Sequence, residues 1–145
     1  MKTIFRFLLL MMLFSSWGLR SFAQSVSPGL WKSRTEIEIN SVPMPPIPIE
    51  DCLGSKDAKD IRNYIQENLM PETKCQITKW EFKKPKLKAS LSCKNSQGTS
   101  QGHLGGEIAD KSFDISGTLD GDHVIMGSVE ISVHYKGSYV KACKN

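Results

Sequence analysis

Alternation of buried and polar side chains constrains the fold of this chain more than any other feature. In the stretch 31–40 the charged residues share one parity, and the other parity is taken by Trp31, Ser33, Thr35, Ile37 and Ile39. Successive side chains of a β-strand point to opposite faces of its sheet, so this stretch predicts a strand with one buried face. Because similar alternation recurs up to about residue 140, we expect a mainly β fold.

A β-hairpin is predicted between residues 75 and 93. On its first strand Thr78, Trp80 and Phe82 are expected to point inward, and Pro85 marks the turn. The return strand alternates with lysines and serines and directs inward Leu87, Ala89, Leu91 and Cys93. The lysines around this turn are typical of a hairpin tip that avoids pairing with other sheets, although they could also meet an anionic surface.

The rest of the chain continues as short antiparallel strands. A weaker strand carries Leu104 and Ile108, and its glycines at 102, 105 and 106 suggest a bend or bulge. The next strand carries Phe113 and Ile115, a turn is expected at 120–122, and the last strands are expected at 124–126 and about 129–140. Six or seven such strands predict a strongly curved sheet or an up-and-down barrel.

One amphipathic helix is predicted after Cys52. Ser55 is the expected N-cap, Pro71 is expected to end the helix, and apolar residues recur at spacings of three and four, namely Ala58, Ile61, Ile65 and Leu69. This pattern predicts a helix laid on the sheet or across the mouth of a barrel, within a mainly β (α+β) fold.

The stretch 41–48 is rich in proline and precedes the helix. Proline lacks the N–H that a strand ladder needs, so we expect an extended surface connection there. Met44 and Ile47 within it are expected to cover one end of the core.

Residues 1–23 have the three parts of a cleavable export signal. Lys2 and Arg6 precede the apolar run 7–14, and small residues follow at 21–23. The run is shorter than the roughly 20 residues of a membrane span, so we expect residues 24–145 to form one soluble domain, periplasmic or, alternatively, secreted. Three of the 19 basic side chains lie in the signal, which leaves 16 against 15 acidic ones and disfavours a nucleic-acid partner.

All four cysteines follow the signal, which predicts two disulfides in an oxidising compartment. Cys93 and Cys143 share the parity of inward residues on their strands, whereas Cys75 has the opposite parity from Trp80. Parity therefore favours pairing Cys52 with Cys75 and Cys93 with Cys143. The main alternative joins Cys75 to Cys93 across the hairpin.

No motif for catalysis, a metal or a cofactor is found. The histidines are far apart at 103, 123 and 134, and disulfide-bonded cysteines leave no nucleophilic thiol. We therefore expect a structural or interaction domain of the cell envelope that is not an enzyme. The alternative is a binding protein for a small apolar molecule or lipid inside a barrel-like cavity. The inward residues that fill the core or face such a ligand are Trp31, Trp80, Phe82, Leu91, Phe113 and Ile131.

Several elements together resemble a known family. They are the start Pro28-Gly29-Leu30-Trp31, the pair Cys52-Leu53 after the proline-rich stretch, the cysteines at 75 and 93 around a tryptophan hairpin, and the late Cys143. Over about residues 28–143 this arrangement is similar to the exported bacterial family known as domain of unknown function 3617. The chain departs from the family pattern at Lys32, at Gly54 and in its last two residues. The resemblance implies a periplasmic or secreted bacterial protein and carries over no catalytic residues.

Overall fold

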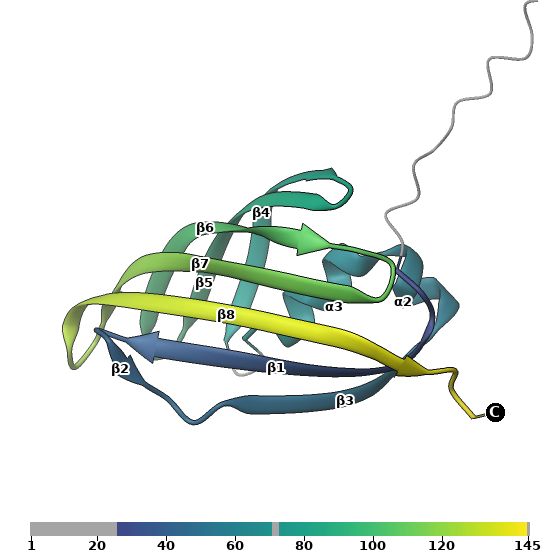
Figure 1. The fold of residues 1–145 in the computed structure, drawn as a ribbon. Helices are drawn as coiled ribbons and strands as arrows, with labels where there is room; N and C mark the ends of the chain where they lie inside the picture. Colours follow the sequence, from purple (N-terminus) through teal and green to yellow (C-terminus); the bar gives the residue numbers. More distant parts are fainter. Residues whose placement is uncertain (1–25, 71–72, 145) are drawn as a thin grey trace, which may run out of the picture.

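The computed structural model describes residues 26–70 and 73–144, and most of them lie in one antiparallel sheet (Figure 1). The predicted export signal lies outside these residues. The helices are α2 (Ser55–Lys59) and α3 (Ile61–Asn68). The strands are β1 (Gly29–Ile39), β2 (Val42–Pro43), β3 (Ile47–Leu53), β4 (Lys74–Lys83), β5 (Lys86–Asn95), β6 (Gly98–Ile108), β7 (Ser112–His123) and β8 (Gly127–Lys141).

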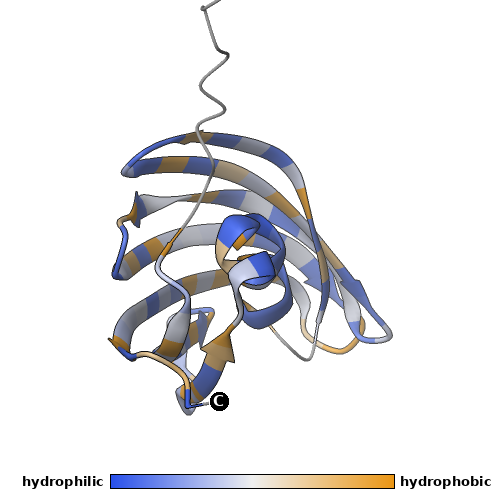
Figure 2. Ribbon diagram, turned by 90° about the vertical axis from the view of Figure 1, so that its right-hand side faces the viewer, coloured by the Kyte–Doolittle hydropathy of each residue, from blue (hydrophilic) through white to orange (hydrophobic). Residues whose placement is uncertain are grey.

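The sheet is open and strongly curved, which is the first of the two predicted architectures (Figure 2). Its strands run in the order β2-β1-β8-β7-β6-β5-β4, and β3 also pairs with β1, so β4 and the β2–β3 segment form the two edges. Viewed along the sheet, the strands curl around the two helices, which lie in the concave side (Figure 2). The prediction of a mainly β fold is confirmed, and the sheet does not close into a barrel.

Glycines on the inner face of β6 and β7 allow this curvature. A Cβ atom on Gly102 would lie 2.0 Å from the carbonyl oxygen of Thr118, and one on Gly117 would lie 2.0 Å from that of His103. Each of these glycines faces a leucine across the ladder, Leu119 and Leu104 respectively. The register of β6 is unbroken against both neighbours, so the glycines accommodate a bend and not the bulge that was the other expectation.

A bulge lies instead in β4. Its register against β5 shifts between Ile77 and Lys79, so Thr78 is the extra residue. Thr78 is exposed, which corrects the prediction that it points inward, and Ile77 is buried. One extra residue reverses the alternation, and Cys75 therefore lies on the same side as Trp80 despite its opposite parity.

The disulfides are Cys52–Cys143 and Cys75–Cys93, so the favoured pairing was wrong and its alternative across the hairpin is correct. Cys75 and Cys93 are direct partners in the β4–β5 ladder. Cys52 lies opposite Leu30 of β1, which in turn lies opposite Lys141 near the end of β8. The parity argument failed because it counted through the β4 bulge and through a second register shift, at Val140 of β8.

The helical segment is interrupted at Asp60. Gly54, not Ser55, is the N-cap of α2, and no side chain caps it. The Asp60 side chain accepts a hydrogen bond from the backbone N–H of Asn63 at 3.4 Å and so caps α3. The predicted inward positions are buried, and the break turns two short helices onto the concave face.

Two other segments differ from expectation. Much of the proline-rich stretch pairs with β1, and Pro48 is tolerated because it lies on an edge strand. The predicted turn at 120–122 is part of β7, and residues 124–126, expected as strand, form the turn to β8. Local turn propensity at Asp120 was overridden by pairing with β6 and β8.

The free edge of β4 is partly covered by α3. Arg62 donates a hydrogen bond from Nη2 to the carbonyl oxygen of Ile77 at 2.7 Å. The backbone N–H of Ile77 donates to Gln66 Oε1 at 2.8 Å. Two helix side chains thus satisfy backbone groups that a sheet edge would otherwise leave unpaired, and they fix α3 against the sheet.

Candidate functional site: an apolar cleft at the open end of the sheet

The concave face is filled at the end where β1 begins. The Trp31 indole stacks on Phe113 with ring centroids 5.6 Å apart, and Phe113 lies 4.7 Å from Tyr135. Trp31 Nε1 donates to the carbonyl oxygen of Ser27 at 2.9 Å. All three rings are at most 2% exposed, so Trp31 and Phe113 belong to the core.

A small polar cluster is buried beneath the helices. The Tyr135 hydroxyl donates to Ser33 Oγ at 3.4 Å. The Tyr64 hydroxyl of α3 lies close to Tyr135 and has no hydrogen bond of ordinary geometry. Burial raises the pKa of Tyr135 far above its usual value, and burial, followed by the charge of Asp51, raises the pKa of Tyr64. Both hydroxyls therefore stay protonated at neutral pH.

The remaining candidate residues do not converge on one place. Leu91 is buried in the core, whereas Trp80 and Phe82 are half-buried on the edge strand β4 with ring centroids 6.2 Å apart. Ile131 is half-buried on β8, near the opposite end from Trp31. Of these candidate residues, Ile131 alone lines the apolar cleft at that end.

The cleft has a volume of about 320 Å³. Its floor comes from β1 and β8, one wall from the proline-rich segment, and the other from the residues that follow α3. The lining residues are Ile37, Ile39, Met44, Pro45, Ile47, Met70, Thr73 and Ile131. This size falls within the range of roughly 300–1,000 Å³ that is typical of small-molecule sites, and the lining is almost entirely apolar.

A second hollow of about 150 Å³ adjoins the cleft and shares Ile39, Met70, Thr73 and Ile131 with it. It extends toward β6 and the end of β7, where Ser100 and His123 are among its lining residues. The apolar cleft therefore has a more polar side chamber.

The cleft is open because α3 is too short to cover it. Along β1 the inward residues Trp31, Ser33 and Thr35 are at most 6% exposed under the helices, but Ile37 and Ile39 beyond them are only half-buried. Figure 1 shows this open end on the left, where the turns β1–β2 and β7–β8 lie.

Sequence reasoning found part of this site. Parity placed Ile37, Ile39 and Ile131 inward, and Met44 and Ile47 were expected at one end of the core. Met70 was missed, because it follows the last residue of the helical pattern and its position depends on how the chain leaves α3. Nothing local in the sequence indicated that these residues surround an open space.

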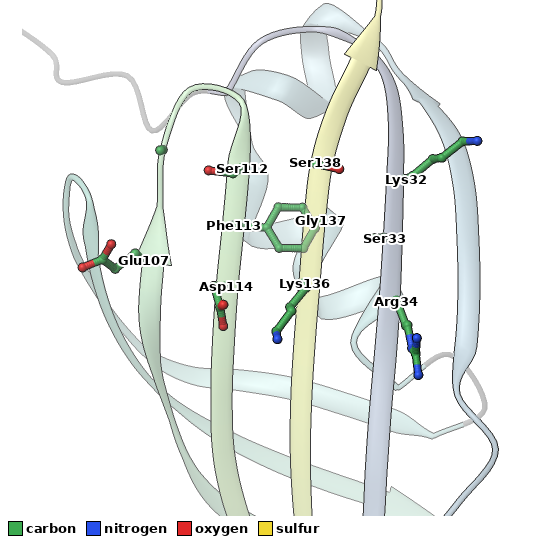
Figure 3. Close-up of a pocket in the computed structure, with 11 residues that line it drawn as sticks. Lys32, Ser33, Arg34, Glu107, Ser112, Phe113, Asp114, Lys136, Gly137 and Ser138 are labelled. Atoms are coloured by element: carbon green, nitrogen blue, oxygen red, sulfur yellow. The ribbon is translucent and has the colours of Figure 1, made fainter.

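The outer face of the sheet carries a separate, charged hollow of about 490 Å³ over β1, β7 and β8 (Figure 3). Lys32 and Arg34 line it, but each is paired with a carboxylate, Glu50 at 3.2 Å and Glu36 at 3.0 Å. Figure 3 shows the Phe113 ring behind Gly137, whose missing side chain leaves room for it on the inner face. These exposed ion pairs are typical of a solvated sheet face and contribute little to stability.

The histidines do not form a metal site. His134 Nε2 lies 2.7 Å from Asp114 Oδ1, and its Nδ1 lies 3.8 Å from Glu36 Oε2, both on the exposed outer face. His103 Nδ1 lies 3.2 Å from Ser90 Oγ, also exposed. Within residues 26–70 and 73–144, no three His, Cys, Asp or Glu side chains are grouped as a metal ion would need.

Comparisons with known proteins identify the family. The family model described as "Protein of unknown function (DUF3617)" matches residues 26–143, so the chain belongs to this family, as its sequence features indicated. Searches of curated proteins and of solved structures found no match. In the part of the chain that the structure describes, neither helix has the length and apolar character needed to cross a bilayer.

Proposed function

We propose that this member of the DUF3617 family is an exported, non-catalytic protein that binds a small apolar molecule in the cleft at the open end of its sheet. Sequence alone favoured a structural or interaction role, with ligand binding as the alternative. The cleft of about 320 Å³ is the observation that favours ligand binding. A dry, filled core would have left no such space at the end of the concave face.

The lining indicates what kind of molecule fits. None of the residues that line the cleft is charged, and of these residues Thr73 is the one with a hydroxyl group. A ligand of this site is therefore an apolar chain or ring whose polar end, if it has one, points to solvent or to the side chamber near His123. Charged molecules are disfavoured, because burying a charge without a partner is costly.

The expected affinity is modest. Burial of about ten methylene groups would contribute about 8 kcal/mol before the costs of association are subtracted. This corresponds to dissociation constants on the order of micromolar or weaker. Such affinity suits reversible carriage or sensing of an apolar molecule rather than permanent storage.

Export to the periplasm is part of the proposal. Residues 1–23 have the form of an export signal, and two disulfides support an oxidising compartment. The proposal includes no catalytic step and no cofactor.

Fluorescence titration with the apolar probe N-phenyl-1-naphthylamine tests the cleft directly. We expect saturable binding that Ile131→Gln weakens at least tenfold. Ser132→Gln, on the next residue of β8 with its side chain on the outer face, is the matched control and should leave the affinity within about twofold. Native mass spectrometry of protein purified from its own host should in addition show the extra mass of a retained apolar ligand.

Two results would contradict the proposal. Equal probe affinity in the Ile131→Gln variant and in its parent would show that the probe binds elsewhere. Lack of both probe binding and a retained mass would show that the cleft is not a ligand site. A structural or interaction role, carried by the outer surface, would then be favoured.

A further inference from the structure

The turn between β7 and β8 presents three consecutive apolar side chains to solvent. Val124 is 72% exposed, Ile125 is 87% exposed and Met126 is 52% exposed. Hairpin turns are usually built from glycine, asparagine, aspartate or other polar residues. We call residues 124–126 the apolar tip, and its composition is not explained by the fold.

The apolar tip is held in a defined conformation. The Nδ1 atom of His123 accepts hydrogen bonds from the backbone N–H groups of Ile125 at 3.2 Å and Met126 at 3.3 Å. The N–H of Val124 donates to the carbonyl oxygen of Gln97 in the β5–β6 turn at 2.8 Å. An ordered apolar group loses less conformational entropy on binding, so this turn is preorganised for contact.

The same end of the sheet carries further exposed apolar residues, Val42 of β2 at 61% and Met44 just after β2 at 46%. Two hydrogen bonds join that turn to β8: the N–H of Asn40 donates to the carbonyl oxygen of Glu130 at 2.8 Å, and the N–H of Glu130 donates to Asn40 Oδ1 at 2.9 Å. The β1–β2 and β7–β8 turns lie at the same end of the sheet (Figure 1), so exposed apolar residues gather at that end.

Carboxylates border the apolar tip. Asp120 of β7 lies directly opposite Glu130 of β8. Asp122 is exposed on β7, and Glu38 is exposed on β1, which pairs with β8. Within the described ranges, none of these four carboxylates forms an ion pair with a lysine or arginine. Like charges placed directly opposite destabilise a sheet, so a basic partner surface would relieve a cost that the isolated chain carries.

We infer that the apolar tip docks into a protein partner whose surface offers an apolar pocket bordered by lysine or arginine side chains. The acidic border disfavours a bilayer with anionic headgroups, which attracts basic segments instead. It also disfavours a second copy of this chain, because a symmetric contact would bring the carboxylates of both copies together. Met44 also lines the cleft, but no residue of the apolar tip does, so substitutions in the tip test this inference separately from ligand binding.

Photo-crosslinking in the native host tests the inference on the full-length chain. p-Benzoylphenylalanine is placed at position 125, and at position 96 on the neighbouring exposed turn as the matched control. We expect position 125 to yield one protein adduct that position 96 does not. The captured protein is identified by mass spectrometry, purified, and titrated against the mature chain.

The titration decides whether that adduct reports docking. We expect Ile125→Asp to weaken the affinity at least tenfold, and Asp122→Lys combined with Glu130→Lys to weaken it severalfold, with binding also weaker at high salt. Ser96→Asp should change it less than twofold. Naphthylamine binding in the cleft should stay the same in Ile125→Asp, which separates this test from that of the proposed function.

Several results would overturn the inference. They are the lack of an adduct specific to position 125, and an affinity that Ile125→Asp leaves unchanged. Binding to vesicles of phosphatidylethanolamine and phosphatidylglycerol that depends on Ile125 would assign the apolar tip to a bilayer. A dimer of the purified chain that Ile125→Asp abolishes would assign it to a second copy.

Discussion

The two ends of the concave face are built from the same strands, β1 and β8, yet one is filled and the other is open. At the filled end Trp31 and Tyr135 are at most 1% exposed beneath the helices. At the open end Ile37, Ile39 and Ile131 are only half-buried, although they have the same parity. The comparison teaches that alternation selects a face of a sheet, whereas the elements packed on that face decide how deeply each residue is buried.

Each end also has its own disulfide. Cys52–Cys143 joins β3 to the end of the chain beside the filled end, and Cys75–Cys93 joins β4 to β5 beside the open end. Cys93 lines the side chamber, so the Cys75–Cys93 bond lies next to the cleft without joining its two walls.

Among the predicted changes, removal of the Trp31 indole at the filled end should lower the free energy of unfolding most. Trp31→Ala is expected to lower the free energy of unfolding by about 3–5 kcal/mol, because it deletes a fully buried aromatic ring. Ile39→Ala at the open end should cost less than half as much. Urea denaturation of both variants measures this, and a Trp31→Ala loss below about 1 kcal/mol would contradict the assignment of a filled end.

Removal of either disulfide should cost about 2–4 kcal/mol. Replacing Cys52 and Cys143 with alanine should cost more than replacing Cys75 and Cys93, because the first bond closes a loop of 91 residues and the second a loop of 18. Denaturation of the two double variants gives the ranking. Peptide mapping without reduction checks the pairing itself, and a fragment joining Cys52 to Cys75 would contradict it.

Alkaline pH should lower the free energy of unfolding through Tyr135, a residue of the filled end. The folded state raises the pKa of Tyr135 above its usual 10.0, so it favours the protonated hydroxyl. This contribution is complete below pH 10 and is lost as the pH rises above it, because the unfolded chain then ionises and the folded one does not. At pH 11 the loss from one such tyrosine is about 1.4 kcal/mol.

Denaturation at pH 9 and pH 11 measures this loss, and Tyr135→Phe should reduce it. The tyrosinate absorbance of Tyr64 and Tyr135 should appear together with unfolding rather than before it. Ionisation of both residues in the folded protein near pH 10 would show that water reaches their hydroxyl groups beneath the helices.

The apolar tip should give the smallest effect on stability. Ile125→Asp is expected to change the free energy of unfolding by less than about 0.5 kcal/mol, because the side chain is 87% exposed. Thermal denaturation of this variant beside its parent is the check. A loss above about 1 kcal/mol would show that Ile125 packs against the protein, which would remove the basis for docking.

Local pattern predicted much of the fold. The alternation of β1, the hairpin of β4 and β5, and the inward residues of the helical segment are confirmed, because each depends on neighbours a few positions away. Parity failed at Thr78, where a single extra residue in β4 reversed it and led to the wrong disulfide pairing. Turn propensity failed at Asp120–Asp122, where pairing with strands on both sides outweighed it.

The candidate site was less predictable than the fold. Ile131 was a candidate residue and Ile37 had the right parity, but Met70 and the open space between them depend on where α3 ends over the sheet. Alternation, helical spacing and cysteine count are local properties that the sequence determines by itself. Which strands pair, which cysteines meet and which part of the inner face stays uncovered were decided by the tertiary structure, because they arise from contacts between residues far apart in the chain.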